Sequence, residues 1–299
     1  MPWWTRASGT AEPGGVVMRA SGWKNPVWLR FRARPRAVFG LVIVLAYLLA
    51  AVFAPWVAPF DPVDQDLSLA LKGPRPGYWL GNDEYGRDML SRIIYGARLS
   101  FLIGTAAVAI ALVGGGLLGV VAGYRGGWAD NLIMRCMDVM LAFPSFLLAL
   151  AIVSILGPGI VNLIVAIGVF SIPTFARVAR GAVLSVVHLD YVEAARSSGA
   201  GDWRIIWRYV IPNSMAPLIV LSTMRMATAI ITASGLSFLG LGAQPPTPEW
   251  GAMLSTGREY LRAAPHVATV PGLAIMFLVL GFNLFGDGLR DALDPRLKV

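Results

Sequence analysis

Charged residues are missing from four long stretches of the chain. No Asp, Glu, Lys or Arg occurs in residues 37–60, 99–124, 139–176 or 267–286. A run of about 20 apolar residues crosses the hydrocarbon core of a membrane as one helix. This pattern predicts an all-α integral membrane protein, because a globular domain with one buried core would not carry so many such runs.

Proline, glycine and charged residues divide these stretches into five predicted transmembrane helices, and a sixth, interrupted by Arg225, is predicted outside them. Pro144 is expected to kink the third helix. Glycines at 114–116 and 119 are expected to let the second helix approach a neighbour closely. A separate amphipathic surface helix is predicted at 85–98, and a proline-rich loop at 242–265. The six helices are predicted near residues 37–57, 99–122, 132–156, 160–176, 214–236 and 267–285.

Basic residues concentrate in the short segments between apolar runs, so the net charge of +8 does not indicate nucleic-acid binding. If the N-terminus is cytoplasmic, 17 Lys and Arg fall in cytoplasmic segments and 7 in external ones. This bias predicts cytoplasmic N- and C-termini in a plasma membrane. The predicted regions are a cytoplasmic tail at 1–36, the first helix and an external loop at 37–98, a five-helix core at 99–286 with a cytoplasmic loop at 177–212, and a cytoplasmic tail at 287–299.

The sequence offers no set of residues for catalysis or cofactor binding. None of the three lysines follows a glycine, so there is no Gly-Lys-Ser/Thr phosphate-binding loop. His188 and His266 are far apart and lie in no metal-binding pattern. Cys136 is the only cysteine, which excludes an internal disulfide, and we expect it to be buried and inert. The chain is therefore predicted not to be an enzyme and to hold no metal.

The loop at 177–212 has more local structure than a simple connection needs. Asp190 and Glu193 fit a capping box, which predicts a short helix from Tyr191. Ala194 and Ala195 are small enough to let another surface come close. Gly199 is expected to end this helix in the left-handed conformation.

A second short helix is predicted from Asp202 to the region of Pro212. On spacing alone, two interpretations stay open for the loop. It is either a docking surface, or a linker that lies on the bilayer with Trp203 and Trp207 as interface anchors.

The same residues resemble a family motif. Glu193-Ala194-Ala195, Gly199 and Pro212 match the EAA pattern E-A-A-x3-G-x9-I-x-L-P of binding-protein-dependent ABC importer permeases, with Tyr209 and Ile211 in the two apolar positions. Four further segments are similar to the C-type permeases of dipeptide and oligopeptide importers: 81–88, 237–242, 245–254 and 286–295.

This resemblance implies the type I ABC importer permease fold in a bacterial inner membrane. It also implies a translocation path shared with a second permease subunit, ATP-binding subunits that hold ATP and magnesium, and an extracytoplasmic solute-binding protein. The solute would be a dipeptide or oligopeptide, or in some members a nickel chelate or haem. The implied coupling helix, which docks on the ATPase, involves Tyr191, Glu193, Ala194, Ala195, Ser198, Gly199 and Pro212.

Arg225 is a lone charge in the middle of the fifth predicted helix. Ionisable residues at this depth are costly and usually functional. Arg225 and the neighbouring Met224 are therefore candidates for the translocation path. The alternative is a structural ion pair, either with Asp138 or with another subunit. The intramembrane charges also leave open a stand-alone secondary transporter or channel.

Overall fold

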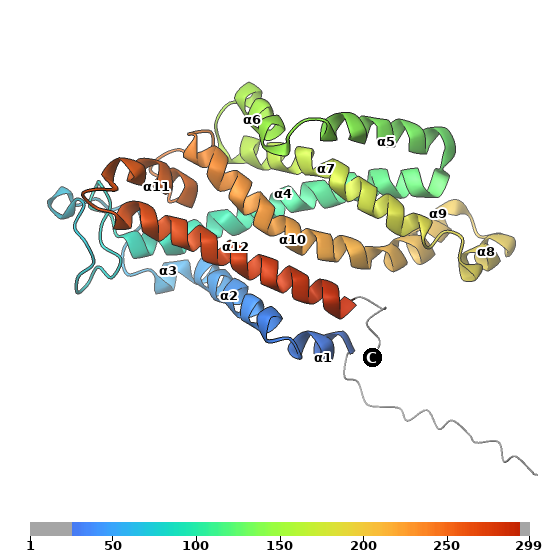
Figure 1. Cartoon of the computed structure of the whole chain (residues 1–299), viewed down its shortest axis with the longest axis horizontal. Coiled ribbons are helices and arrows are strands. Elements are labelled where there is room, and N and C mark those ends of the chain that lie inside the picture. The colour runs from blue at the N-terminus through green and yellow to red at the C-terminus, as the bar shows by residue number, and fades with distance from the viewer. Residues whose placement is uncertain (1–25, 294–299) are drawn as a thin grey trace, which may run out of the picture.

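The computed structural model describes residues 26–293, and within this range the elements are helices with no β-strand. The long helices run roughly along one axis of an elongated bundle (Figure 1). One end carries α11 (Trp250–Gly257) and the other carries α8 (Asp190–Ser197); we call them the α11 end and the α8 end. The remaining elements are α1 (Pro26–Arg32), α2 (Pro35–Val52), α3 (Ala54–Val57), η1 (Leu67–Leu69), α4 (Met89–Arg125), α5 (Gly127–Leu141), α6 (Ser145–Leu156), α7 (Ile160–Leu184), α9 (Asp202–Ile205), η2 (Ile206–Val210), α10 (Ile211–Phe238), η3 (Arg258–Tyr260) and α12 (His266–Leu293).

The predicted transmembrane character is confirmed. Five helices are long and apolar enough to cross a membrane: α2, α4, α7, the continuous 202–238 segment that contains α10, and α12. A sixth span results if α5 and α6 count as one broken helix. The tails predicted at 1–36 and 287–299 lie partly outside the described residues. Where they are described, both contain helix, in α1 and in the last turns of α12.

The prediction of a separate surface helix at 85–98 is wrong, because α4 is one continuous helix of 37 residues. It begins after Asp88, whose carboxylate accepts a hydrogen bond from the Ser91 backbone N–H at 2.8 Å. No helix break occurs at the boundary between residues 98 and 99, so the amphipathic turns up to residue 98 and the apolar turns after it form one helix.

Helix α7 is also longer than predicted. It does not end near Ala176 but continues to Leu184 with Pro173 inside it. An internal proline removes one hydrogen bond, which neighbouring helices can tolerate in a membrane bundle.

The third predicted span is bent much more sharply than a kink. The axes of α5 and α6 differ by 89° at the break that contains Pro144. Proline has no backbone N–H and disfavours a helical residue before it, so the chain leaves the helix at this point. Figure 1 shows α5 lying beside α7, and α6, which also packs against α7, running in a different direction from α5.

The segment at 242–265 is not only a loop. It contains the eight-residue helix α11, whose N-cap Glu249 accepts a hydrogen bond from the Ala252 backbone N–H at 2.8 Å. Trp250 is fully buried, and its indole N–H donates to the Ile93 carbonyl of α4 at 3.1 Å. The sixth span is also longer than predicted, because α12 runs to Leu293.

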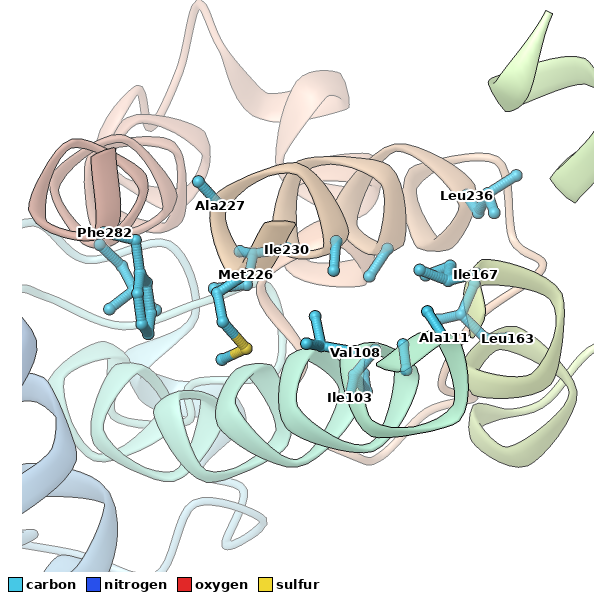
Figure 2. Close-up of a cluster of buried hydrophobic side chains, with 14 of the residues drawn as sticks. Ile103, Val108, Ala111, Leu163, Ile167, Met226, Ala227, Ile230, Leu236 and Phe282 are labelled. Carbon is cyan, nitrogen blue, oxygen red and sulfur yellow. The ribbon is translucent and has the colours of Figure 1, made fainter. Parts of the chain in front are cut away.

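The core forms where α4, α7, α10 and α12 meet, and Figure 2 shows side chains from all four helices gathered there. Two of the α4 glycines are needed for this packing. A Cβ at Gly115 would lie 2.5 Å from the Ile172 carbonyl oxygen, and one at Gly119 would lie 2.4 Å from that of Ala176. The predicted close approach is confirmed at these positions, although Gly116 faces open space.

Candidate functional site

The short helix predicted in the loop exists, but it begins differently. Leu189 is its N-cap and makes no side-chain capping bond, so the predicted capping box is wrong. Asp190 already lies in the first turn together with Glu193, and Arg196 lies in the last turn. Acidic groups at the start and a basic group at the end of a helix oppose its dipole, and this arrangement stabilises α8 without a cap.

The end of α8 is as predicted. Gly199 has φ of 82°, in the left-handed region. Its N–H donates to the Arg196 carbonyl at 3.0 Å, and the Ala200 N–H donates to the Ala195 carbonyl at 3.1 Å. These two bonds form a Schellman motif, which satisfies the last carbonyls of the helix and fixes the direction in which the chain leaves it.

One buried residue holds α8 to the bundle. Val192 is fully buried in a small cluster with Val183 near the end of α7, with Val186 just after α7, and with Ile205 and Val210. The predicted docking residues Tyr191, Glu193, Ala194, Ser198 and Gly199 are exposed, and Ala195 is half-buried. The helix therefore presents most of its surface outward while one side chain anchors it.

The anchor was missed in the sequence. Val192 lies inside the motif-like segment, and it is the single strongly apolar residue of the exposed turn. That isolation was the signal that could have identified it.

The segment after α8 joins it directly to a long helix. The prediction that the Asp202 side chain caps a helix is wrong. It accepts a hydrogen bond from the Tyr124 hydroxyl at 2.7 Å, which connects it to α4. A π-helical turn, η2, then leads into α10. Pro212 lies exposed in the first turn of α10 and does not end the preceding helix. α9, η2 and α10 therefore form one continuous helical segment, which residues 198–201 connect to α8.

Trp203 and Trp207 point outward beside this junction. Their side chains are 73% and 51% exposed, and their rings meet edge to face at 5.4 Å. Both line a cavity of about 560 Å³ between α4 and the start of the 202–238 helix. Exposed tryptophans at a helix end are typical of the membrane–water interface, so this part of the segment retains the anchor interpretation.

Arg225 and Met224 lie halfway along α10. The Arg225 guanidinium donates to the Thr174 hydroxyl of α7 at 3.0 Å. The alternative ion pair with Asp138 is not present, because Asp138 binds Arg177 at 2.6 Å. Cys136, two residues from Asp138 on α5, is exposed rather than buried as predicted.

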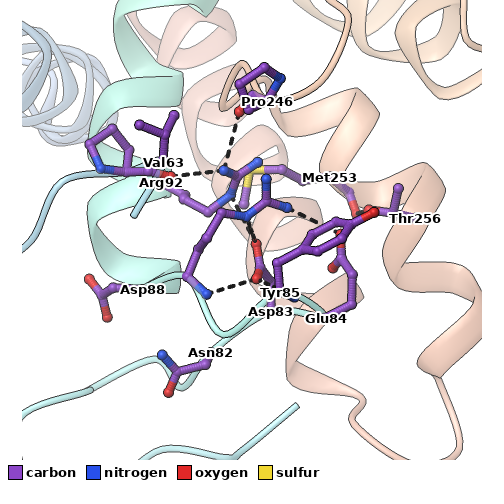
Figure 3. A network of polar contacts seen from close by, with 12 residues as sticks. Val63, Asn82, Asp83, Glu84, Tyr85, Asp88, Arg92, Pro246, Met253 and Thr256 are labelled. Carbon is purple, nitrogen blue, oxygen red and sulfur yellow. Dashed lines mark hydrogen bonds and ion pairs between the residues drawn. The ribbon is translucent and has the colours of Figure 1, made fainter. Parts of the chain in front are cut away.

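A polar network at the α11 end joins three loops to α4 (Figure 3). The Asp83 carboxylate forms ion pairs with two arginines: its Oδ2 lies 2.6 Å from the Nε of Arg87 and 3.3 Å from the Nε of Arg92. All three side chains are buried. Arg92 also donates to the carbonyls of Pro62 at 2.9 Å and Pro246 at 3.4 Å. The network therefore ties the segments before α4 and before α11 together.

Two carboxyl groups near this network are partly or fully withdrawn from water. Burial raises the pKa of the Glu84 carboxyl, although Arg87 lies 3.2 Å from it. Burial also raises the pKa of the Glu249 carboxyl, against the opposing effect of backbone hydrogen bonds at the start of α11. Among residues 26–293, no group of His, Cys, Asp and Glu side chains could hold a metal ion.

Comparisons of this sequence with known proteins all point to one family of transport proteins. A family model described as "Binding-protein-dependent transport system inner membrane component" matches residues 115–299, and one described as "N-terminal TM domain of oligopeptide transport permease C" matches residues 23–74. The chain is 52% identical over 277 residues to the di/tripeptide transport system permease protein DppC of Pseudomonas aeruginosa, covering 91% of each chain. It is 49% identical over 272 residues to the glutathione transport system permease protein GsiD of Pectobacterium atrosepticum, covering 91% and 90%.

Solved structures agree at the level of the fold. The inward-facing MetNI methionine ABC transporter gives a TM-score of 0.55 at 18% identity, covering 69% of this chain and 98% of that one. The long helices of this chain thus adopt the arrangement of an ABC importer permease.

Proposed function

The chain belongs to the family of binding-protein-dependent transport system inner membrane components, and we propose that it is the permease subunit of an ATP-driven importer of short peptides. The observation that carries the proposal is the 52% identity to a di/tripeptide permease over 91% of both chains. Glutathione, named for the 49% relative, is itself a tripeptide. Short peptides with free termini are therefore the proposed solutes, in preference to a nickel chelate or haem.

The chain is proposed to be a non-catalytic subunit. It contains no phosphate-binding loop, so ATP and magnesium would be bound by separate ATP-binding subunits. A second permease would complete the path, and an extracytoplasmic binding protein would deliver the peptide. The membrane is proposed to be the bacterial inner membrane, with surrounding lipid in contact with the exposed apolar faces.

The proposed docking surface for the ATPase is α8 with its Schellman turn. Its support is the exposed surface of Tyr191, Glu193, Ala194, Ser198 and Gly199, with a single buried anchor. ATP-driven movement of α8 would reach α10 through α9 and η2, because these elements are continuous. Pro212, the last residue of the motif, lies at the start of α10, where this movement would arrive.

The proposed orientation places the α8 end in the cytoplasm, together with both termini. Its support is the excess of basic residues, 17 to 7, in the segments that would then be cytoplasmic. Single cysteines at the exposed positions Ser68 and Gln244, in a Cys136→Ser background, should react with impermeant reagents added outside the cell. A cysteine at Ser198 should not react, and the reverse pattern would contradict the orientation.

The substrate class is tested with the complete importer in proteoliposomes. ATP hydrolysis is measured with its binding protein and dialanine, trialanine, glutathione, a nickel chelate or haem. We expect stimulation by at least one of the three peptides and none by the other two solutes. Stimulation by the nickel chelate or haem alone would contradict the proposed substrate.

A further inference from the structure

Arg225 is the only charged residue in the 28 residues of α10, and its surroundings leave its charge unbalanced. It is half-buried, and its hydrogen bond to a side chain is the one to Thr174. Within residues 26–293, no carboxylate lies within ion-pair distance of its guanidinium. Asp130 and Asp138, the acidic residues of α5, are bound to Arg180 and Arg177 of α7.

A guanidinium at this depth needs an anion or water, since hydrocarbon solvates neither charge nor N–H groups. Thr174 supplies one hydroxyl oxygen, while a guanidinium has five N–H donors. The hydroxyl bond orients the group and leaves most of its donors available. The structure therefore presents a fixed, incompletely satisfied anion-binding group in the middle of the bundle.

A cavity of about 570 Å³ lies between α7, α10 and α12, and neither Arg225 nor Thr174 is among its lining residues. Arg225 is one helical turn beyond Leu221, and Thr174 is one turn before Val178; both of these apolar residues line the cavity. The volume falls in the range of about 300–1,000 Å³ that is usual for small-ligand sites. Other lining residues are Pro217, Val220, Met224 and Arg290.

The charges around the cavity have one sign. Arg290 lines it toward the α8 end, and no Asp or Glu is among its lining residues. Asp287 and Asp291 line a different cavity, between α2 and α12, which Arg290 also lines and where Asp291 pairs with Arg34. Apolar walls with Arg290 in the lining and Arg225 one helical turn beyond Leu221 suit a small solute that carries a carboxylate.

We infer that Arg225, oriented by Thr174, binds the C-terminal carboxylate of the peptide as it passes the middle of the membrane. This inference rests on the proposed function. Peptides differ in their side chains but share a terminal carboxylate, and arginine can bind a carboxylate through two parallel N–H···O bonds. Met224, Leu221 and Val220 form an apolar wall without directional bonds, which accepts varied side chains. A single fixed charge on a permissive wall gives recognition of the peptide backbone without sequence preference.

The first test is uptake of radiolabelled dialanine by the complete importer in proteoliposomes. Arg225→Gln should lower the maximal uptake rate by at least about tenfold while the complex still assembles, because a charge-assisted pair is lost from a poorly hydrated site. Arg225→Lys should retain more of the rate than Arg225→Gln, since it keeps the charge but not the paired geometry. Arg177→Gln is the matched control, because it removes an arginine of α7 that is already paired with Asp138.

Two results of this test would overturn the inference. Uptake by Arg225→Gln at the rate of Arg177→Gln would show that the guanidinium does not meet the peptide. Loss of the companion permease from purified Arg225→Gln complexes would assign Arg225 to an ion pair between subunits instead.

The second test remains informative even if the glutamine variant does not assemble. Arg225→Cys in a Cys136→Ser background is treated, in the assembled importer, with the anionic reagent sulfonatoethyl methanethiosulfonate. We expect modification, and we expect dialanine with the binding protein and ATP to slow it. Absence of modification, or modification that dialanine does not slow, would contradict the inference.

These outcomes separate the inference from the proposed function. If the parental importer accumulates dialanine but position 225 is neither reactive nor protected, peptide import stands and the role of Arg225 is wrong. If the parental importer accumulates none of the short peptides, the proposed function itself fails.

Discussion

Replacing Gly199 by valine tests the coupling surface with little disturbance of its surroundings. A Cβ added at Gly199 would meet no atom within 4 Å, so a steric clash with neighbours does not contribute. The effect comes from the backbone, whose φ of 82° lies in the left-handed region. An L-residue pays about 1–2 kcal/mol there, and a branched Cβ makes this conformation still less favourable.

The strain affects the Schellman turn that sets the direction in which the chain leaves α8. If Gly199→Val relaxes to negative φ, the bonds from Gly199 to Arg196 and from Ala200 to Ala195 are lost together. About 1–2 kcal/mol changes the population of the aligned helix by a factor of about 5 to 30. We expect peptide uptake and peptide-stimulated ATP hydrolysis to fall by a factor in this range, with normal insertion into the membrane.

Gly201→Val is the matched control. Gly201 also has no atom within 4 Å of an added Cβ, but its φ is −68°, which valine adopts without strain. Both variants are reconstituted and compared for uptake and ATP hydrolysis. If Gly199→Val transports as fast as Gly201→Val, α8 is only a linker and the proposed coupling is wrong.

Three further perturbations test other parts of the structure. Ala195→Asp should reduce the amount of ATPase that co-purifies with the permease, because an unpaired charge buried in a docking contact costs several kcal/mol. Asp83→Ala should lower the free energy of unfolding by about 3–5 kcal/mol in detergent, since it leaves buried Arg92 without a carboxylate and Arg87 with Glu84 alone. Asp291→Ala, at a pair that is 43% and 41% exposed, should change it by less than about 1 kcal/mol. Burial raises the pKa of Glu249 in the folded state, so its contribution to stability is present below the ordinary pKa and is lost as pH rises through the raised one. Thermal unfolding of Glu249→Gln should therefore show a smaller decline with rising pH than the parent, and equal declines would contradict this assignment.

The elements that follow from local sequence were predicted well. Charge-free runs locate the membrane helices other than α10, which contains Arg225, and the need for a left-handed residue after α8 identified Gly199. The glycine-rich stretch of α4 predicted a close helix contact, which Gly115 and Gly119 make. These features depend on the hydropathy and backbone freedom of the residues themselves.

The features that depend on distant residues were not predicted. The true length of α7 depends on its packing along α4, which carries it past Pro173. Helix α11 depends on burial of Trp250 against the Ile93 carbonyl, a contact between residues far apart in the chain. Asp138 pairs with Arg177 rather than with Arg225 because α5 lies beside α7, and no local pattern encodes that geometry.

The central claim is that this chain moves short peptides using ATP hydrolysed by partner subunits. The most direct test is accumulation of radiolabelled dialanine, trialanine or glutathione in proteoliposomes that contain the complete importer, with ionophores that collapse proton and sodium gradients. The account predicts that at least one of these peptides accumulates only with ATP, binding protein and ATPase subunits all present, at a rate that the ionophores do not change. Uptake of these peptides by the chain alone, driven by an ion gradient and abolished by the ionophores, would contradict it.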